Sequence, residues 1–173
     1  MIENTSGIEL DHSWLRLLGG KGDDGLPGIE EANRAAVGLM VVAYDILGGV
    51  FALDGGAFGA GDGSVHYFAP DTLRWDNLEL GHSDFAEAMF SGLITAFYEP
   101  LRWPGWEQEV ARLAPTEGIA VYPFLFSEEG SNPATSRRSP VTLTELLYAN
   151  NAAAQQLNGP NAGPAIPLPA GTE

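Results

Sequence analysis

The sequence predicts an α+β fold in which one mostly antiparallel sheet packs against two or three helices. Three apolar runs typical of strands lie between Val37 and Ala69, and their connections are too short for crossover helices. Helical patterns then begin near Asp84 and after Thr142, with strand character between them. A chain of 173 residues that is 45% apolar can bury a core of this kind in one domain.

The expected strands lie in the first half of the chain. Residues 8–18 read as one strand with a bulge, because Asp11 and His12 interrupt its apolar alternation. A glycine-rich loop and a short helix over 29–36 follow. The central strands are expected over 38–44, 50–53 and 64–68, and a flexible glycine-rich connection over 54–63 joins the last two.

The clearest helix is expected over 84–98, with Ser83 as its N-cap and a stripe of apolar residues at every fourth position. A second helix should begin at Pro104, because proline is well placed in a first helical turn. A strand is expected over 118–126, where Pro123 favours an edge position or a bend.

A capping box and a proline-rich segment define the C-terminal organisation. Thr142 and Glu145 have the capping-box spacing and open a last helix. Residues 158–173 contain four prolines and three glycines without a core-forming pattern. We therefore expect a single domain over 1–157 and a disordered tail over 158–173.

The charge of the chain restricts its partners. Its 23 acidic and 8 basic residues give a net charge of −15, which repels nucleic acid and would attract a basic protein. The first 14 residues lack the basic and apolar regions of a signal peptide. The longest apolar run, Val37–Leu53, is short and is interrupted by Asp45, so we expect a cytoplasmic protein with no membrane span.

No pattern in the chain indicates catalysis or metal binding. The absence of cysteine excludes disulfides, thiolate metal sites and a cysteine nucleophile. The three histidines, His12, His66 and His82, lack the spacing of a zinc site. The glycines of 54–63 are not followed by the Lys-Ser or Lys-Thr of a phosphate-binding loop. We expect no catalytic residues, no metal ligands and no cofactor.

Two tryptophan-containing segments are candidates for binding. Leu101–Trp106 places two tryptophans around Pro-Gly, which makes a rigid corner that packs helices onto the sheet or serves as a binding platform. Trp75 lies close in sequence to Asp71, Asp76 and Glu79, an aromatic among acids that suits a basic segment. These four residues are the predicted partner-binding site.

Several long strings of residues carry a family resemblance. They are Asp45–Gly56, Val65–Leu73 with Trp75, Ser83–Phe85, and Phe97–Tyr98 with Arg102–Trp106. Together they resemble a bacterial family of proteins of unknown function, over about Leu10 to Asn150. More loosely, a glycine-bounded strand followed by Phe-Ala-Pro-Asp and Trp is similar to the SUKH superfamily of Smi/Knr cell-wall regulators and bacterial immunity proteins. That resemblance implies an α+β domain that binds a toxin or another protein without catalysis.

Three functional hypotheses follow. The first is a non-enzymatic acidic domain that binds a basic protein, as an immunity-type protein does. The second is an enzyme whose Asp, Glu and His groups come from separate segments, for example a pocket that collects His66, Asp71 and Trp75. The third is a structural or assembly subunit, which would present a large apolar interface.

Overall fold

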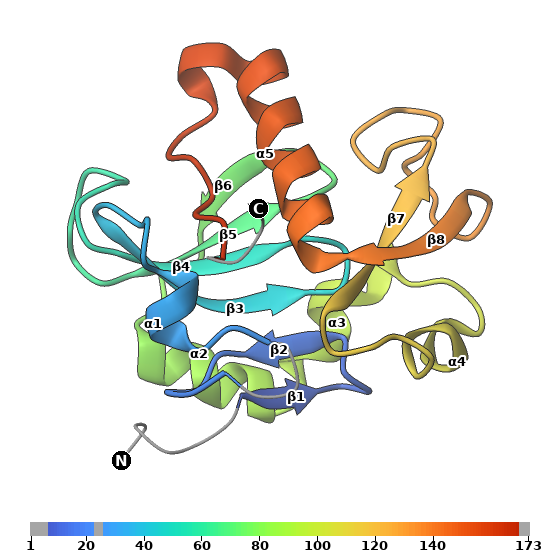
Figure 1. Ribbon diagram of the computed structural model, residues 1–173, viewed down its shortest axis with the longest axis horizontal. Coiled ribbons are helices and arrows are strands. Elements are labelled where there is room, and N and C mark those ends of the chain that lie inside the picture. Colours follow the sequence, from blue (N-terminus) through green and yellow to red (C-terminus); the bar gives the residue numbers. More distant parts are fainter. Residues whose placement is uncertain (1–6, 23–25, 170–173) are drawn as a thin grey trace.

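The computed structural model describes residues 7–22 and 26–169 of the chain. Its main sheet has six strands that follow one another in chain order, each antiparallel to the next (Figure 1). The strands are β1 (Ile8–Leu10), β2 (Leu15–Leu17), β3 (Leu39–Asp45), β4 (Val50–Asp54), β5 (Val65–Ala69) and β6 (Arg74–Asn77). The α+β class and the antiparallel central strands are thus confirmed.

The described residues also form five α-helices, two short 3-10 helices and a second, two-stranded sheet that the sequence did not predict. The helices are α1 (Ile29–Ala32), α2 (His82–Phe90), α3 (Leu93–Tyr98), α4 (Trp106–Val110), α5 (Leu143–Asn158), η1 (Glu99–Leu101) and η2 (Gly159–Asn161). The small sheet pairs β7 (Glu117–Tyr122) with β8 (Arg137–Thr142). No helix in the described part is long and apolar enough to cross a membrane.

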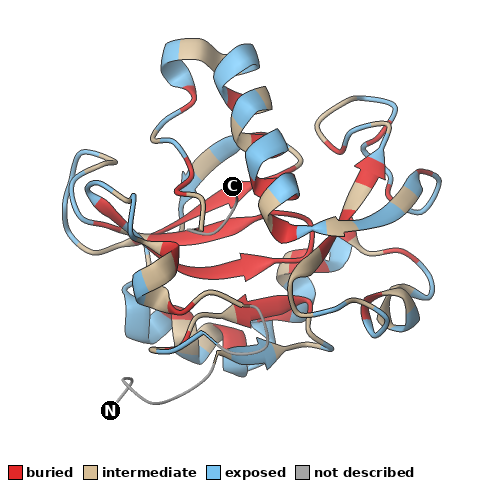
Figure 2. Ribbon diagram, viewed as in Figure 1, coloured by how far each residue is buried: buried red, intermediate tan, exposed pale blue. Residues whose placement is uncertain are grey.

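Both faces of the central sheet are covered, so β3, β4 and β5 are buried along almost their whole length (Figure 2). On one face, Phe51 of β4 and Tyr67 of β5 stack at 4.5 Å between ring centroids, and Phe85 of α2 packs against Phe51. On the other face, Tyr44 and Phe68 pack with side chains of α5. Strands buried on two faces are continuously apolar, which explains the unbroken run over 39–44.

Residues 8–18 form a hairpin rather than one bulged strand. Leu10 of β1 pairs with Leu15 of β2, and Asp11, His12 and Ser13 between them have φ values of 51°, 56° and 68°. This left-handed turn reverses the chain direction. The interruption at Asp11 and His12 therefore marks a turn.

The helix expected over 84–98 is broken into α2 and α3. Gly92 has a φ of +87° and separates the two, and Gly81 rather than Ser83 is the N-cap of α2. The break rotates the second helix relative to the first. Consequently Ile94 is buried in the core, whereas Leu93, which continued the predicted stripe, is 59% exposed.

Other element boundaries also differ from the expectations. The helix expected from Pro104 begins at Trp106, because Gly105 is its N-cap with φ +82°. The helix expected over 29–36 ends at Ala32, and the strand expected over 118–126 ends at Tyr122. The capping box of α5 is confirmed, since the Thr142 hydroxyl accepts from the Glu145 amide in the predicted arrangement.

The glycine-rich connection between β4 and β5 is organised by the buried carboxylate of Asp54. It accepts hydrogen bonds from the backbone N–H groups of Gly56, Phe58 and Gly61. Desolvation opposes ionisation of Asp54, but these three donors outweigh it and lower its pKa. Asp54 thus ties three positions of this loop to the end of β4, and the Phe58 ring stacks on His66 of β5.

The segment after α5 packs on the sheet through residue 169, although the sequence predicted a disordered tail over 158–173. Ala162 and Ile166 are each 3% exposed, and the Ile166 amide donates to the Asn151 side chain. A few apolar side chains placed between prolines are enough to anchor it, which composition alone conceals. Residues 170–173 lie outside the described part.

Candidate functional site

A cleft of about 750 Å³ lies at the Arg-Trp-Pro-Gly-Trp corner and is a candidate binding site. Its walls come from three parts of the chain: the β1–β2 turn, α3 with its N-cap Gly92 and the following η1, and residues 102–107. Asp11 and His12 come from the turn, Glu99 from η1, and Arg102 and Trp106 from the corner. We call it the Trp106 cleft.

Arg102 fixes the geometry of the Trp106 cleft. Its guanidinium carbon lies 4.1 Å from the Trp106 ring centroid and 5.0 Å from that of Trp14, and it forms an ion pair with Asp11. The Arg102 side chain is 10% exposed, and its Nε has no hydrogen-bond partner in the described part of the chain. A planar cation between aromatic rings holds both rings in place.

The turn that supplies Asp11 and His12 has an uncommon backbone. Three consecutive non-glycine residues in the left-handed region cost free energy, on the order of 1 kcal/mol each. The turn brings the Asp11 carboxylate to Arg102 and sets the His12 ring edge-on to Trp106, with centroids 5.6 Å apart. Such backbone outliers concentrate at functional sites, which favours the Trp106 cleft as one.

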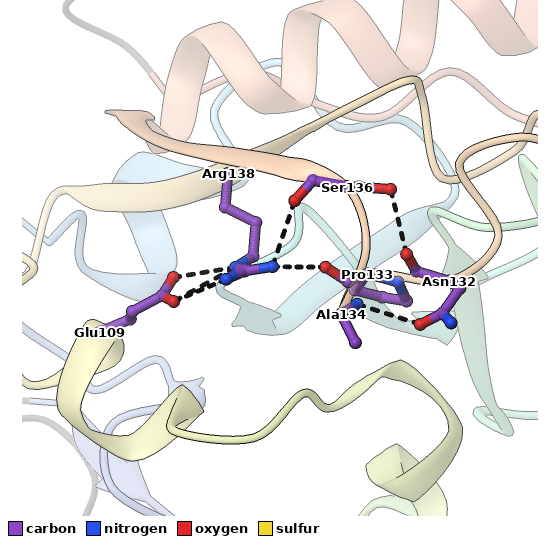
Figure 3. A network of polar contacts seen from close by, with 6 residues as sticks. All are labelled: Glu109, Asn132, Pro133, Ala134, Ser136 and Arg138. Carbon is purple, nitrogen blue, oxygen red and sulfur yellow. Dashed lines mark hydrogen bonds and ion pairs between the residues drawn. The ribbon is translucent and has the colours of Figure 1, made fainter.

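Helix α4, which carries Trp106, is held by a second ion pair (Figure 3). Arg138 of β8 donates from Nε and Nη2 to the two carboxylate oxygens of Glu109. Its Nη1 donates to the carbonyls of Pro133 and Ser136. Hydrogen bonding from Arg138 lowers the pKa of Glu109. The small sheet thereby positions one wall of the Trp106 cleft.

The Trp106 cleft carries excess negative charge. Asp11, Glu99 and Glu107 line it together with one arginine. The described residues contain two ion pairs, and neither includes Glu99 or Glu107. Two carboxylates beside a half-buried tryptophan form an environment that favours an ammonium or guanidinium group.

The structure separates two of the four residues that were predicted to bind a partner. Trp75 pairs with Phe68 and Asp76 with Tyr67, so their side chains point to opposite faces of the sheet. Asp71 is half-buried in the preceding turn, and Glu79 is exposed beyond the end of β6. Sequence proximity grouped them, whereas strand alternation separates them.

Trp75 lies under the C-terminal segment, where its indole Nε1 donates to the Pro164 carbonyl at 3.0 Å. Its ring contacts Phe58 and Phe68 edge-on, with centroids 5.0 and 5.5 Å apart. A second cleft of about 580 Å³ brings Trp75 and His66 together, as the enzyme hypothesis supposed, but Asp71 does not line it. We call it the β6 cleft.

Arg16 and Asp45 are buried charged residues whose contacts were not predicted from the sequence. Arg16, 1% exposed, donates to the carbonyls of Pro115 and Glu117 at 2.6 Å and so ties β2 to the segment entering β7. Asp45 is fully buried and has its own set of donors. In the sequence, the position of a charged residue inside an apolar run was the available sign that its side chain is buried.

The Asp45 carboxylate is saturated with hydrogen bonds. The amides of Leu47 and Gly49 donate to one oxygen at 2.9 and 2.7 Å, and the hydroxyls of Tyr67 and Tyr98 donate to the other at 2.8 and 3.0 Å. Desolvation raises the pKa of Asp45, and these hydrogen bonds oppose the rise. With its acceptor sites filled, Asp45 holds the β3–β4 turn and α3 together. Within the described residues, no three His, Asp or Glu side chains converge as metal ligands.

A family model and two bacterial proteins match this chain. A family model described as "Protein of unknown function DUF2625" matches residues 1–146. "Putative uncharacterized protein YbfG" of Escherichia coli is 38% identical over 151 residues, which cover 84% of this chain and 68% of the relative. An "Uncharacterized protein" of Haemophilus influenzae is 33% identical over 133 residues, covering 72% of this chain and 57% of the relative.

No solved structure matches the chain. The family model, in contrast, covers most of its length, including the Asp45 turn and all three walls of the Trp106 cleft. The chain belongs to the bacterial DUF2625 family, whose function is not known.

Proposed function

We propose that this protein is a non-enzymatic binding domain that receives a basic segment of a protein partner in the Trp106 cleft. The proposal rests on one observation: Glu99 and Glu107 line the same cleft as the ring of Trp106, and neither glutamate belongs to an ion pair in the described part of the chain. A lysine or arginine side chain entering there would meet carboxylates and an aromatic surface together.

The charge of the whole chain supports the same partner class. A net charge of −15 produces a field that accelerates the approach of a basic protein and weakens with salt. Three of the eight basic residues are engaged within the fold: Arg16 is buried, and Arg102 and Arg138 are paired with acids. The ion pairs take up Asp11 and Glu109 as well, and the buried Asp45 and Asp54 outnumber the buried Arg16, so the surface keeps nearly all of the net negative charge.

The resemblance to SUKH proteins, which include bacterial immunity proteins, is consistent with this role. An immunity-type protein works by occupying a surface of a toxin, and it needs a fixed, preorganised site rather than reacting groups. The rings and charges around Arg102 supply such a site. We extend the proposal to an immunity-type partner on this ground.

The test uses fluorescence anisotropy with a labelled peptide of alternating Arg, Lys and Gly, and an acidic peptide of equal length for comparison. We expect the basic peptide alone to bind, and its affinity to fall as salt is raised from about 50 to about 500 mM. The double variant Glu99→Gln/Glu107→Gln should weaken binding at least about tenfold, because it removes the local partners of the cation.

A matched control removes two charges elsewhere. Asp76→Asn/Glu79→Gln changes the net charge equally and should weaken binding less than about threefold, through the long-range field alone. Loss of binding in this control with retention in the Glu99/Glu107 variant would instead support the docking point predicted around Trp75. That outcome, or failure of the basic peptide to bind, contradicts the proposal.

A further inference from the structure

The β6 cleft differs in charge from the rest of this acidic protein. Its charged lining groups are Arg74 and the ionisable His66, and none of its described lining residues is Asp or Glu. The cleft is thus lined by an arginine and no carboxylate, in a chain with 23 acidic and 8 basic residues. Arg74 is exposed and forms neither of the two ion pairs in the described part.

The walls of this cleft are preorganised. The Phe58 ring stacks on His66 at 3.9 Å with an interplanar angle of 6°, and Trp75 meets Phe58 edge-on. The Asp54 carboxylate holds the amide of Phe58, and the Pro164 carbonyl holds the indole of Trp75. Aromatic walls fixed in this way do not need to be ordered when a ligand arrives.

Polar groups complete the cleft at its two sides. Asn77 extends from β6, and Asn161 comes from η2 after the last helix. The volume of about 580 Å³ lies within the usual range for small-molecule sites, about 300–1,000 Å³. An apolar, aromatic cavity with a few polar groups is the usual composition of such a site.

We propose that the β6 cleft binds a small organic anion that carries a flat ring. Arg74 leaves β6 on the face opposite to Trp75, but β6 is the edge strand of the sheet and Arg74 lines the cleft. The anionic head, a phosphate or carboxylate, pairs with Arg74 at this edge, and the ring lies against the aromatic walls formed by Phe58 and Trp75. Because no Asp or Glu lines the cleft, and the nearby Asp54 carboxylate accepts hydrogen bonds from three backbone amides, such an anion meets less repulsion here than over the rest of the surface. This site is separate from the Trp106 cleft, so either proposal can fail without the other.

One wall of the β6 cleft lies outside the region that the family model matches. Asn161 to Pro164 follow residue 146, where that match ends. The wall nevertheless packs closely on the sheet, since a methyl group added at Gly163 would lie 2.9 Å from the Trp75 ring. The C-terminal segment thus closes the site from outside the family core.

Isothermal titration calorimetry of the full chain tests the proposal with three probes. Adenosine 5′-monophosphate and 4-hydroxybenzoate supply the two anionic heads, and adenosine is the neutral counterpart of the first. We expect at least one anion to bind, and adenosine to bind at least about tenfold more weakly than its monophosphate because it lacks the charge.

Two variants locate the binding. Arg74→Gln should weaken the bound anion at least about tenfold, whereas Arg137→Gln, which removes an exposed arginine from another strand, should leave affinity within about twofold. Asn161→Ala, on the opposite wall, should also weaken binding. Circular dichroism verifies that each variant is folded.

Three results would overturn the proposal: neither anion binds, adenosine binds as tightly as its monophosphate, or Arg74→Gln and Arg137→Gln behave alike. Preference between phosphate and carboxylate identifies the head group. An Arg74-dependent response to either head supports the site.

Discussion

The hydroxyl of Tyr98 donates a hydrogen bond to the buried carboxylate of Asp45, 3.0 Å away and 53 residues earlier in the chain. This contact joins the end of β3 to the end of α3. It thereby connects the sheet to the helices that cover one of its faces. Tyr67 donates to the same oxygen from β5. The position of α3 beside the Trp106 cleft thus depends on a carboxylate in the core.

Asp45→Asn should be tolerated, whereas Asp45→Ala should not. Asparagine keeps a carbonyl for the amides of Leu47 and Gly49, and its amino group can donate to the tyrosine oxygens. Alanine leaves buried donors unsatisfied and should lower the free energy of unfolding by about 3 kcal/mol or more. Urea denaturation at neutral pH measures both, and equal losses for the two variants would contradict the role assigned to Asp45.

The buried Asp45 carboxylate also predicts in which direction the stability of the fold changes with pH. Burial raises the pKa of Asp45 in the folded protein, so between its ordinary value and that raised value the folded state binds more protons than the unfolded state. This group therefore destabilises the fold progressively as pH rises through that window. The stability of the wild type relative to Asp45→Asn should increase as pH falls into the window, and a change in the opposite direction would show that the pKa is not raised.

Gly49→Ala should destabilise strongly for a purely steric reason. A Cβ at Gly49 would overlap the Asp45 carboxylate and come within 2.7 Å of the Tyr67 hydroxyl. We expect a loss of about 3 kcal/mol or more in the free energy of unfolding. Gly59→Ala is the control, because Gly59 has open space around it and only its φ of +108° opposes alanine, at about 1 kcal/mol. Similar losses at the two positions would refute the steric account.

Glu109→Gln should lower stability at neutral pH but not in acid. Its lowered folded-state pKa contributes stability that is present above the ordinary glutamate value and is lost as pH falls through the lowered one. The pair is partly exposed, so we expect about 1 kcal/mol. Denaturation of both proteins from pH 7 to pH 3 measures the difference, which should shrink as pH falls; a constant difference would assign the loss to packing.

Trp75→Phe should loosen the C-terminal segment. It removes the donor to the Pro164 carbonyl and should increase amide hydrogen exchange over 159–169, with a loss of about 1 kcal/mol in stability. Tyr148→Phe, on the exposed side of α5, serves as the control and should change neither. If exchange over 159–169 is as fast in the wild type as in Trp75→Phe, the packing of this segment is not stabilised by Trp75.

Local patterns predicted the parts of the fold that depend on local sequence. The apolar runs of β3 to β5 and the capping box of α5 are such cases, because burial on two faces and helix capping leave direct signals. The polar strands β6 and β8 left none. Arg74–Asn77 and Arg137–Thr142 are mostly exposed and are strands only because of the neighbour with which each pairs.

The candidate site was less accessible to sequence reasoning than the fold. The Trp-Pro-Gly-Trp corner was recognisable as unusual, but its partner Asp11 lies 91 residues away from Arg102. The acids near Trp75 are close in sequence, yet β6 directs Trp75 and Asp76 to opposite faces. Residues far apart in the sequence therefore meet, and residues close in the sequence are separated, because the fold decides which charges lie together.

The central claim is that a basic segment enters the cleft at Trp106. The most direct test records the indole N–H signals of the ¹⁵N-labelled protein by NMR while the Arg/Lys/Gly peptide is added, with Trp75→Phe and Trp106→Phe used for assignment. We predict that the Trp106 signal shifts most and that the Trp75 signal stays in place. A bound peptide that leaves Trp106 unmoved, or that shifts Trp75 instead, would contradict the account.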